Sequence, residues 1–278
     1  MPDRDELAPP ADAAELHAAI ERSEADACSA WLDEASVIDA IHAITALTEQ
    51  DLVALLSLLP ADEAAELIGL LPEHQATEAV TLLDAVAAAE ILHRMPSDER
   101  ADLVGSLDDE AAGAILEHLE SSTAEEVRRF VSYGDEVAGA IMISEFLVFQ
   151  ESTNVREILA DLEANAEAYR SYDIQYTYIV DAEGVLQGVL PLRKLLLAPR
   201  AVAARDLMIG DPIRVPDTMP LDELRLVFRE YSFLGLPVVD ASGALIGLVE
   251  RESVVQTQLD EADSLYRQTQ GIVGGEEL

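Results

Sequence analysis

Residues 71–96 read LPEHQATEAVTLLDAVAAAEILHRMP, and this stretch shows the pattern that decides the fold of the N-terminal half. At a constant spacing of twelve, a proline or an acidic residue directly follows a leucine or methionine. The six equivalent pairs are Leu59-Pro60, Leu71-Pro72, Leu83-Asp84, Met95-Pro96, Leu107-Asp108 and Leu119-Glu120. Proline or an acid in the first turn favours a helix start, because the N–H groups there lack partners within the helix. The spacing therefore predicts a row of helices of roughly eight residues each.

Helices this short cannot bury an apolar face alone, so we expect them to stack on one another as a superhelix. The helical pattern extends from about residue 31 to residue 133. Residues 1–30 are rich in Ala, Glu and Asp and contain Pro9 and Pro10, so they are expected to be a flexible start. A stacked repeat can serve as a binding surface or as a packing scaffold, and the pattern leaves both interpretations open.

After Gly134 the sequence changes to short β-branched runs bounded by turn residues. The runs at residues 176–180, 188–190, 236–239 and 246–249 are predicted strands. They alternate with helical stretches at residues 155–162 and 221–231. The whole chain is therefore predicted to be a multidomain protein with an all-α superhelical repeat domain followed by α/β modules.

The C-terminal half contains an internal duplication. Residues 179–188 read IVDAEGVLQG and residues 238–247 read VVDASGALIG, at an offset of 59. In both copies an Asp-x-x-Gly turn is predicted to join two apolar strands as a hairpin. A copy of about 60 residues is small for an independent domain, so the two should pack as one unit. The predicted boundaries are residues 138–200 and 201–258.

The composition is strongly acidic, with 55 Asp plus Glu against 17 Lys plus Arg and a formal charge of −38. Nucleic acid is excluded as a partner, because the chain repels a polyanion and has no basic stripe. A cationic ligand is permitted. However, Lys194 is the only lysine, which favours a general solvated acidic surface of the kind that salt-adapted proteins use for solubility.

Other sequence features argue against several classes of protein. Cys28 is the single cysteine, which fits a reducing cytosol, and the N-terminus lacks a secretory signal. No apolar run approaches the roughly 18 residues of a spanning helix. There is no glycine-rich phosphate loop, no Gly-x-Ser-x-Gly elbow and no Cys/His cluster, and the five histidines are scattered. We therefore do not expect an enzyme.

Residues 133–142, YGDEVAGAIM, join the helical repeat to the first copy, and the second copy contains ARDLM at 204–208 and LPVVD at 236–240. This combination resembles the cytosolic region of MgtE magnesium transporters, with a helical N-terminal domain, tandem CBS domains and a connecting helix at residues 259–278. The resemblance implies a homodimer through the CBS domains that regulates its own transmembrane pore from the cytoplasmic side of the membrane. The tail ends where the first transmembrane helix would be expected.

The resemblance also implies metal ligands. In the family, Mg²⁺ bridges acidic residues of different domains, and the matching positions here are Asp98, Asp102, Asp222, Glu223 and Glu261. The i, i+4 spacing of Asp98 and Asp102 places both carboxylates on one helix face. Other acidic positions of the family are replaced here, by Ser232, Ser253, Gln256, Ser264 and Leu265.

A second implication is nucleotide binding, because CBS pairs commonly hold adenine nucleotides. Arg193 matches a phosphate-binding arginine and Phe233 a base-stacking aromatic residue, whereas Lys194 replaces the family's aspartate. The sequence therefore leaves three hypotheses: a Mg²⁺-sensing gate, a sensor for ATP or AMP, and a structural adaptor without ligands.

Overall fold

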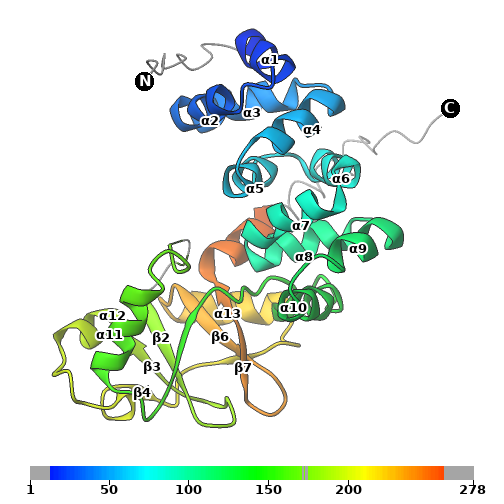
Figure 1. Cartoon of the computed structure of the whole chain (residues 1–278). Helices are drawn as coiled ribbons and strands as arrows, with labels where there is room; N and C mark the ends of the chain where they lie inside the picture. Colours follow the sequence, from blue (N-terminus) through cyan, green and yellow to red (C-terminus); the bar gives the residue numbers. More distant parts are fainter. Residues whose placement is uncertain (1–12, 171, 173–174, 260–278) are drawn as a thin grey trace, which may run out of the picture. The chain divides into compact units, whose positions relative to one another are not determined.

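The chain divides into two compact units, residues 1–132 and residues 133–278. A computed structural model describes residues 13–170, 172 and 175–259. Figure 1 traces the first unit as helices from blue to green and the second as mixed helices and strands from green to orange. The expected division between an all-α part and an α/β part is confirmed.

The described part of the first unit forms ten α-helices of eight to eleven residues. They are α1 (Ala13–Glu21), α2 (Ala25–Glu34), α3 (Val37–Thr45), α4 (Glu49–Leu58), α5 (Ala61–Gly69), α6 (Glu73–Leu82), α7 (Ala85–Arg94), α8 (Ser97–Gly105), α9 (Asp109–Leu116) and α10 (Ser121–Val131). The residues spaced by twelve are the N-caps of α5 to α10, one position before the first turn. The N-cap contributes its carbonyl to the first helical bond, so a proline there costs no hydrogen bond.

The apolar residue before each N-cap anchors the repeat. Leu59, Leu71, Leu83, Met95, Leu107 and Leu119 are all buried. Each such side chain contributes about 1.5–3 kcal/mol when removed from water. The period of twelve therefore places one buried anchor and one helix start at each junction between successive helices.

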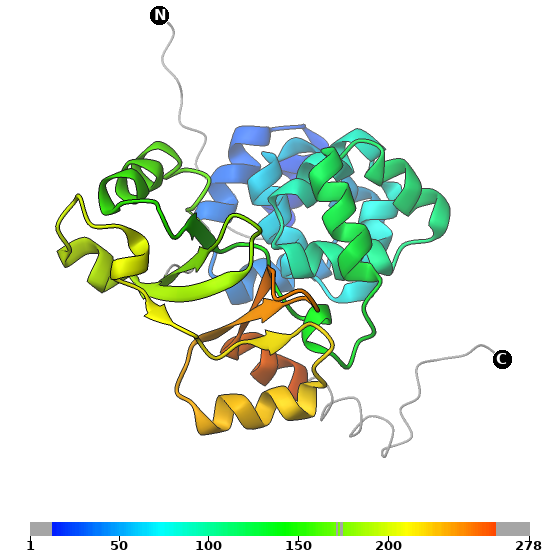
Figure 2. The same cartoon turned by 90° about the horizontal axis from the view of Figure 1, so that it is seen from below.

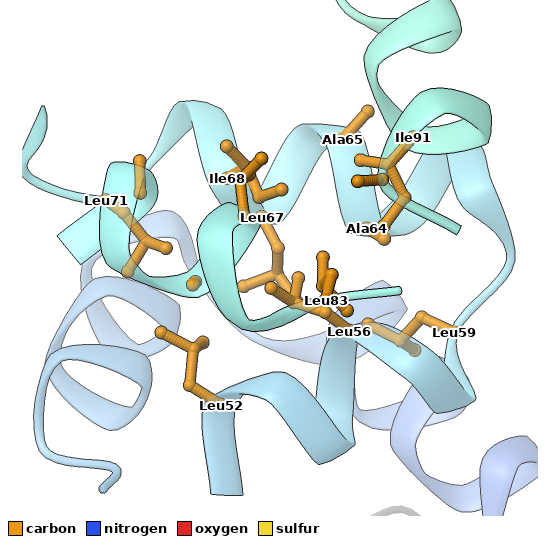
Figure 3. Close-up of a cluster of buried hydrophobic side chains, with 14 of the residues drawn as sticks. Leu52, Leu56, Leu59, Ala64, Ala65, Leu67, Ile68, Leu71, Leu83 and Ile91 are labelled. Carbon is orange, nitrogen blue, oxygen red and sulfur yellow. The ribbon is translucent and has the colours of Figure 1, made fainter. Parts of the chain in front are cut away.

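The short helices pack in two rows, as the stacking argument predicts. In one row α5 packs on α7 and α7 on α9, while in the other α4 packs on α6, α6 on α8 and α8 on α10. Small residues such as Ala64 and Ala65 at the contacts allow the helices to approach closely. Figure 3 shows Leu56, Leu67 and Leu83 pointing into the apolar interior that these helices share.

The prediction of a flexible start is wrong for residues 13–30. This segment forms α1 and most of α2, and Leu16, Ile20 and Trp31 are buried in the same core as the repeat. Leu16, Ala19 and Ile20 follow the i, i+3, i+4 spacing of one helix face, which the high content of Ala and Glu obscured. Helix α1 packs on α2 and α4, so the repeat begins earlier than predicted.

The second unit contains two small sheets with helices beside them. The first copy comprises β1 (Leu147–Gln150), α11 (Val155–Ala164), β2 (Tyr176–Val180), β3 (Leu186–Pro191) and α12 (Leu192–Leu197). The second comprises β4 (Ile209–Gly210), β5 (Val215–Pro216), α13 (Leu221–Glu230), β6 (Gly235–Val239), β7 (Leu245–Glu250) and a helix over residues 251–259. The strand orders are β1-β2-β3-β4 and β5-β6-β7. Figure 2 shows the second copy in yellow and orange.

Both predicted hairpins are present. Strands β2 and β3 pair antiparallel, as do β6 and β7, while β1 and β5 add in parallel to β2 and β6. Asp181 and Asp240 begin the two turns, and Gly184 and Gly243 adopt φ values of +82° and +85°, which glycine reaches without strain. The two turns also bond each other, from Leu186 N to Gly243 O and from Leu245 N to Gly184 O.

The opening segment of each copy lies against the other copy in space, while the boundaries at residues 138–200 and 201–258 stay a prediction. Ala138 N donates to Met219 O and Ile143 N to Leu248 O, so the segment before β1 lies on the second copy. Reciprocally, Ala204 N donates to Thr153 O, and β4 pairs with β3 of the first copy. Each copy therefore completes the other, which explains why they form one unit.

Two methionine–glycine contacts support this exchange. Met142 lies over Gly247 of the second hairpin, and Met208 lies over Gly188 of the first. A Cβ atom at either glycine would come within 2.5 Å of the methionine sulfur. The absence of a side chain at both positions is therefore what admits the opening segments.

Candidate functional site

The acidic residues predicted from the repeat lie together at the start of α8. Asp98 and Glu99 are in its first turn and Asp102 follows one turn later. Asp98 is half-buried and Asp102 exposed. Asp98 Oδ1 accepts a hydrogen bond from Glu99 N at 2.9 Å. The structure thus presents three carboxylates along one turn near the positive end of the helix dipole.

Glu99 shows that these charges affect one another. Its carboxylate lies against Gly69, where an added Cβ would be 3.3 Å from Glu99 Oε2, although the residue as a whole is exposed. Burial of this carboxylate, followed by the charges of Asp98 and Asp102, raises the pKa of Glu99. A cation would relieve this repulsion, so the turn is electrostatically suited to a divalent ion.

Arg100 fixes the turn from the opposite side of α8. Its side chain is buried, with Nη2 donating to Glu126 Oε1 at 2.7 Å and Nη1 to the carbonyls of Leu92 and Met95 at 3.4 and 3.3 Å. Removing one partner of such a buried pair costs about 3–5 kcal/mol. The carboxylates of Asp98 and Asp102 are therefore displayed on a helix that is held firmly.

The acidic pair predicted in the second unit is arranged differently. Asp222 and Glu223 are exposed in the first turn of α13. Asp222 Oδ1 accepts from Arg225 Nη1 at 2.9 Å, and the Arg225 side chain is only 13% exposed. A cation at Asp222 would compete with this guanidinium, an ion pair that the i, i+3 spacing signals and that the sequence reasoning missed.

The remaining predicted metal ligand, Glu261, lies outside the described residues. Asp98 and Asp102 belong to one unit and Asp222 and Glu223 to the other. Within residues 13–170, 172 and 175–259, no three His, Cys, Asp or Glu side chains form a group that could hold a metal. This donor set still fits Mg²⁺, which keeps several waters and needs only one or two carboxylates from each surface.

A cavity of about 330 Å³ lies between the two copies of the second unit. Seven of its lining residues are aromatic or aliphatic: Phe146, Leu147, Tyr176, Tyr178, Leu234, Leu248 and Val255. The rings of Phe146 and Tyr178 meet edge to face with centroids 5.9 Å apart. Glu145, Gln175, Glu250, Arg251 and Glu252 supply its polar groups. The cavity has the size and the mainly apolar character of a small-molecule site.

Neither residue of the predicted nucleotide site lines this cavity. Arg193 is exposed on α12, and Phe233 is half-buried, stacked on Tyr231 with ring centroids 5.5 Å apart. Phe233 does precede Leu234, which is part of the lining. The assignment of Arg193 and Phe233 to a nucleotide therefore stays a prediction.

Arg251 is a structural residue of the cleft that the sequence reasoning missed. Its Nε donates to Phe233 O at 2.8 Å, Nη2 donates to Tyr231 O, and the guanidinium lies 5.1 Å from the ring centroid of Phe228. These contacts attach helix 251–259 to the loop between α13 and β6. The alternation Tyr176-Thr-Tyr178 was the available signal for the cleft, because it places both tyrosines on one face of β2.

Comparisons with known proteins agree with this architecture. The profile of the MgtE intracellular N domain matches residues 35–136, and that of the CBS domain matches residues 204–260. The crystal structure of the soluble part of a magnesium transporter superposes with a TM-score of 0.78 at 25% identity, covering 90% of this chain and 98% of that one. The chain therefore shares its architecture, a helical repeat followed by a CBS pair, with that soluble part.

Two further MgtE proteins extend the comparison. The cytosolic domain of the Mg²⁺ channel MgtE, solved in complex with ATP, has a TM-score of 0.76 and 27% identity, covering 88% of this chain and 99% of that one. The magnesium transporter MgtE of Enterococcus faecalis is 32% identical over 55% of this chain. That match spans only a third of the Enterococcus protein. Among the described residues, no helix is both long and apolar enough to cross a membrane.

Proposed function

We propose that this chain is the regulatory part of an MgtE-type magnesium transporter and that its own pore domain is the partner it controls from the cytoplasmic side. One observation carries the proposal. The likeness to the soluble part of a magnesium transporter runs through both units and covers 98% of that structure. CBS modules occur on many unrelated proteins, so the helical repeat together with the CBS pair is the informative combination. The chain regulates rather than catalyses.

Mg²⁺ is the proposed signal, and the first turn of α8 is its proposed binding site in this unit. Burial first, and then the charges of Asp98 and Asp102, raise the pKa of Glu99, so the three carboxylates of this turn repel one another. A hydrated Mg²⁺ held by Asp98 and Asp102 removes this repulsion and bridges to acidic groups of another surface. Without the ion the same charges favour separation of the domains.

A titration of the whole chain with millimolar Mg²⁺ tests this proposal. The scattering radius should decrease and the melting temperature should rise by mass action, more than with Ca²⁺ or with monovalent salt of equal ionic strength. Unchanged radius and melting temperature would show that the chain does not sense Mg²⁺. The variant Asp222→Asn should retain most of the response, because Arg225 already holds that carboxylate.

Glu99→Gln tests what the charge of this carboxylate costs the fold, through its burial first and through the charges of Asp98 and Asp102 second. Because folding raises the pKa of Glu99, the folded protein loses stability as the pH rises through that raised pKa. The neutral variant should therefore melt higher than wild type at pH 7 without Mg²⁺, and should gain less on addition of Mg²⁺. If Mg²⁺ raised the melting temperature of both proteins equally, Glu99 would not take part in the response to Mg²⁺.

A second candidate function, sensing of an adenine nucleotide, is favoured by the solved MgtE cytosolic domain that is in complex with ATP. Calorimetry with ATP and with AMP tests it. Any signal at the predicted site should disappear in Arg193→Ala and persist in Glu252→Gln. If neither nucleotide nor Mg²⁺ produces a response, the structural-adaptor hypothesis is the one that remains.

We also propose that two copies associate through the CBS modules. Leu196 and Leu197 on α12 and Leu226 on α13 are exposed at 53%, 78% and 60%, and burying such side chains would stabilise an interface. Light scattering should give a dimer that Leu197→Asp with Leu226→Asp converts to a monomer. A monomeric wild-type chain at micromolar concentration would contradict this assembly.

A further inference from the structure

The described part of the first unit contains a cavity of about 430 Å³, lined by α5, α7 and the junction between α9 and α10. The apolar part of its lining is small: Ala89 and Leu119 are buried and Ala61 is half-buried. A cavity of this volume with an apolar base has the features of a small-molecule site. The polar part of the lining is exposed and consists of Glu90, His93, Arg94, His118 and Glu120.

The twelve-residue repeat carries a sequence signal for this cavity. The position directly before the buried anchor is a leucine in α4 and α6, at Leu58 and Leu82. In the row α5, α7, α9 the same position is Leu70 after α5, Arg94 at the end of α7 and His118 after α9. Stacked repeats display equivalent residues side by side. The replacement of leucine by two nitrogen donors therefore falls on one place in the row.

The ionic groups of the lining are available to a ligand. Glu90 and Arg94 are four residues apart on α7, yet neither forms a side-chain hydrogen bond or ion pair with any residue that the structure describes. The same holds for the side chains of His93, His118 and Glu120 within those residues. A guanidinium matches a carboxylate through two parallel hydrogen bonds, and a carboxylate attracts an ammonium group.

The mixture of charges decides the class of ligand. A simple anion would meet the carboxylates of Glu90 and Glu120, and a simple cation would meet the guanidinium of Arg94. A molecule that carries both charges finds a partner for each. The buried Ala89 and Leu119 favour an aliphatic body between these charges.

We propose that this cavity binds a small zwitterion, specifically an aliphatic α-amino acid. The carboxylate of the ligand accepts hydrogen bonds from Arg94 and His118. Its ammonium group donates to Glu90 and Glu120, and its side chain lies on Ala89. This site goes beyond the proposed function, because it needs neither Mg²⁺ nor a nucleotide.

Calorimetry of the whole chain with L-leucine as the probe tests the assignment, because L-leucine carries both charges on an aliphatic body. Two compounds with the same carbon chain serve as controls: isocaproate lacks the ammonium group and isoamylamine lacks the carboxylate. L-Leucine should bind saturably at one site per chain. Each control compound should bind at least about tenfold more weakly, because it leaves one set of lining charges without a counterion.

Variants of the lining locate the site. Arg94→Leu gives α7 the residue that α4 and α6 carry at the equivalent position, so the helix should still fold, and it should weaken L-leucine binding about tenfold. Glu90→Gln should weaken it about fivefold by removing one partner of the ammonium group. The matched controls are Arg128→Leu on α10 and Glu78→Gln on α6, the latter at the position equivalent to Glu90. Arg128 and Glu78 are exposed and lie outside the lining, so both controls should bind as wild type does.

The control compounds and variants also define the results that would overturn the proposal. Isoamylamine binding as tightly as L-leucine would show general attraction of cations to the acidic surface, and isocaproate binding as tightly would show a site for carboxylates only. Equal L-leucine affinity in Arg94→Leu, Glu90→Gln and their controls would move the ligand away from this cavity, and the lack of saturable binding would remove it. Arg94→Leu should keep the wild-type response to Mg²⁺, since Asp98 and Asp102 are unchanged, so this assignment and Mg²⁺ sensing are judged separately.

Discussion

The two copies in the second unit are alike in their turns and unlike in the helix that follows each hairpin. Asp181 and Asp240 each accept hydrogen bonds from two backbone N–H groups of the turn that they begin. Arg193 and Glu252, at equivalent positions beyond the hairpins, have opposite charges. The shared residues are those that backbone geometry requires, whereas the residues near the cleft have changed freely.

This difference teaches which parts of a duplicated scaffold are constrained. The glycines beneath Met142 and Met208 and the acids of the turns set the backbone path, so a change there affects folding. The charges at the helix starts are exposed and contribute little to folding. They can therefore specify different ligands on one scaffold.

The largest expected effect comes from filling the two glycine positions. At Gly188 an added Cβ would meet Met208 Sδ at 2.5 Å and also the backbone oxygen of Ile209 at 2.9 Å. At Gly247 its nearest neighbours are all atoms of the Met142 side chain. Gly188→Ala should lower the free energy of unfolding by about 3 kcal/mol and Gly247→Ala by about 1–2 kcal/mol, measured by urea unfolding.

A compensating substitution distinguishes the two sites. Met142→Ala should restore part of the stability lost in Gly247→Ala, because the clash is with that side chain. Met208→Ala should restore less in Gly188→Ala, since the backbone oxygen remains. If both glycine variants were as stable as wild type, the exchange of opening segments described above would be wrong.

A smaller effect is expected from the turn acids. Asp181 also accepts from Gln187 Nε2 at 2.7 Å, and Asp240 from Ser242 Oγ at 2.6 Å. Asp181→Ala and Asp240→Ala should each cost about 1 kcal/mol, because the partly buried N–H groups of Val185 and Ala244 lose their acceptor. Urea unfolding should give similar losses for both, and Asp→Asn, which keeps one carbonyl acceptor, should cost less. A loss confined to one turn would contradict their structural equivalence.

The smallest expected effect is on the pH dependence of stability. It arises from the hydroxyl of Ser242, which the first turn lacks because Glu183 takes that position. The hydroxyl of Ser242 and then the backbone N–H groups of the turn hold the pKa of Asp240 below its usual value. This carboxylate therefore contributes stability above about pH 4 that is lost as the pH falls through its lowered pKa. Ser242→Ala should reduce this acid-sensitive contribution, seen as a flatter melting temperature between about pH 5 and pH 2. An unchanged profile would assign the shift to the backbone alone.

Much of the fold followed from local patterns. The anchors such as Leu59 and Leu71, the helix starts that follow them and both Asp-x-x-Gly hairpins are encoded by neighbouring residues. The exchange of residues 138–143 and 204–210 was not predictable in this way, because it depends on hydrogen bonds between segments far apart in the chain. Gly188 and Gly247, which leave room for Met208 and Met142, were the only sequence signal of this exchange.

The candidate sites divide in the same manner. Helical spacing was enough to place Asp98 and Asp102 on one turn of α8. The ion pair of Asp222 with Arg225 was also readable from their i, i+3 spacing on α13, and the sequence reasoning missed it. The cavity of Tyr176 and Glu250 depends on the packing of one copy against the other, and residue spacing does not carry that information.

Binding of Mg²⁺ to α8 is tested most directly by calorimetric titration of the whole chain at fixed monovalent salt. Wild type is compared with Asp98→Asn/Asp102→Asn and with the control Asp109→Asn/Glu110→Gln, which removes two charges from the exposed first turn of α9. We expect the first variant to lose Mg²⁺ affinity about tenfold or more and the control to match wild type. Equal affinities in all three proteins would contradict Mg²⁺ sensing through Asp98 and Asp102.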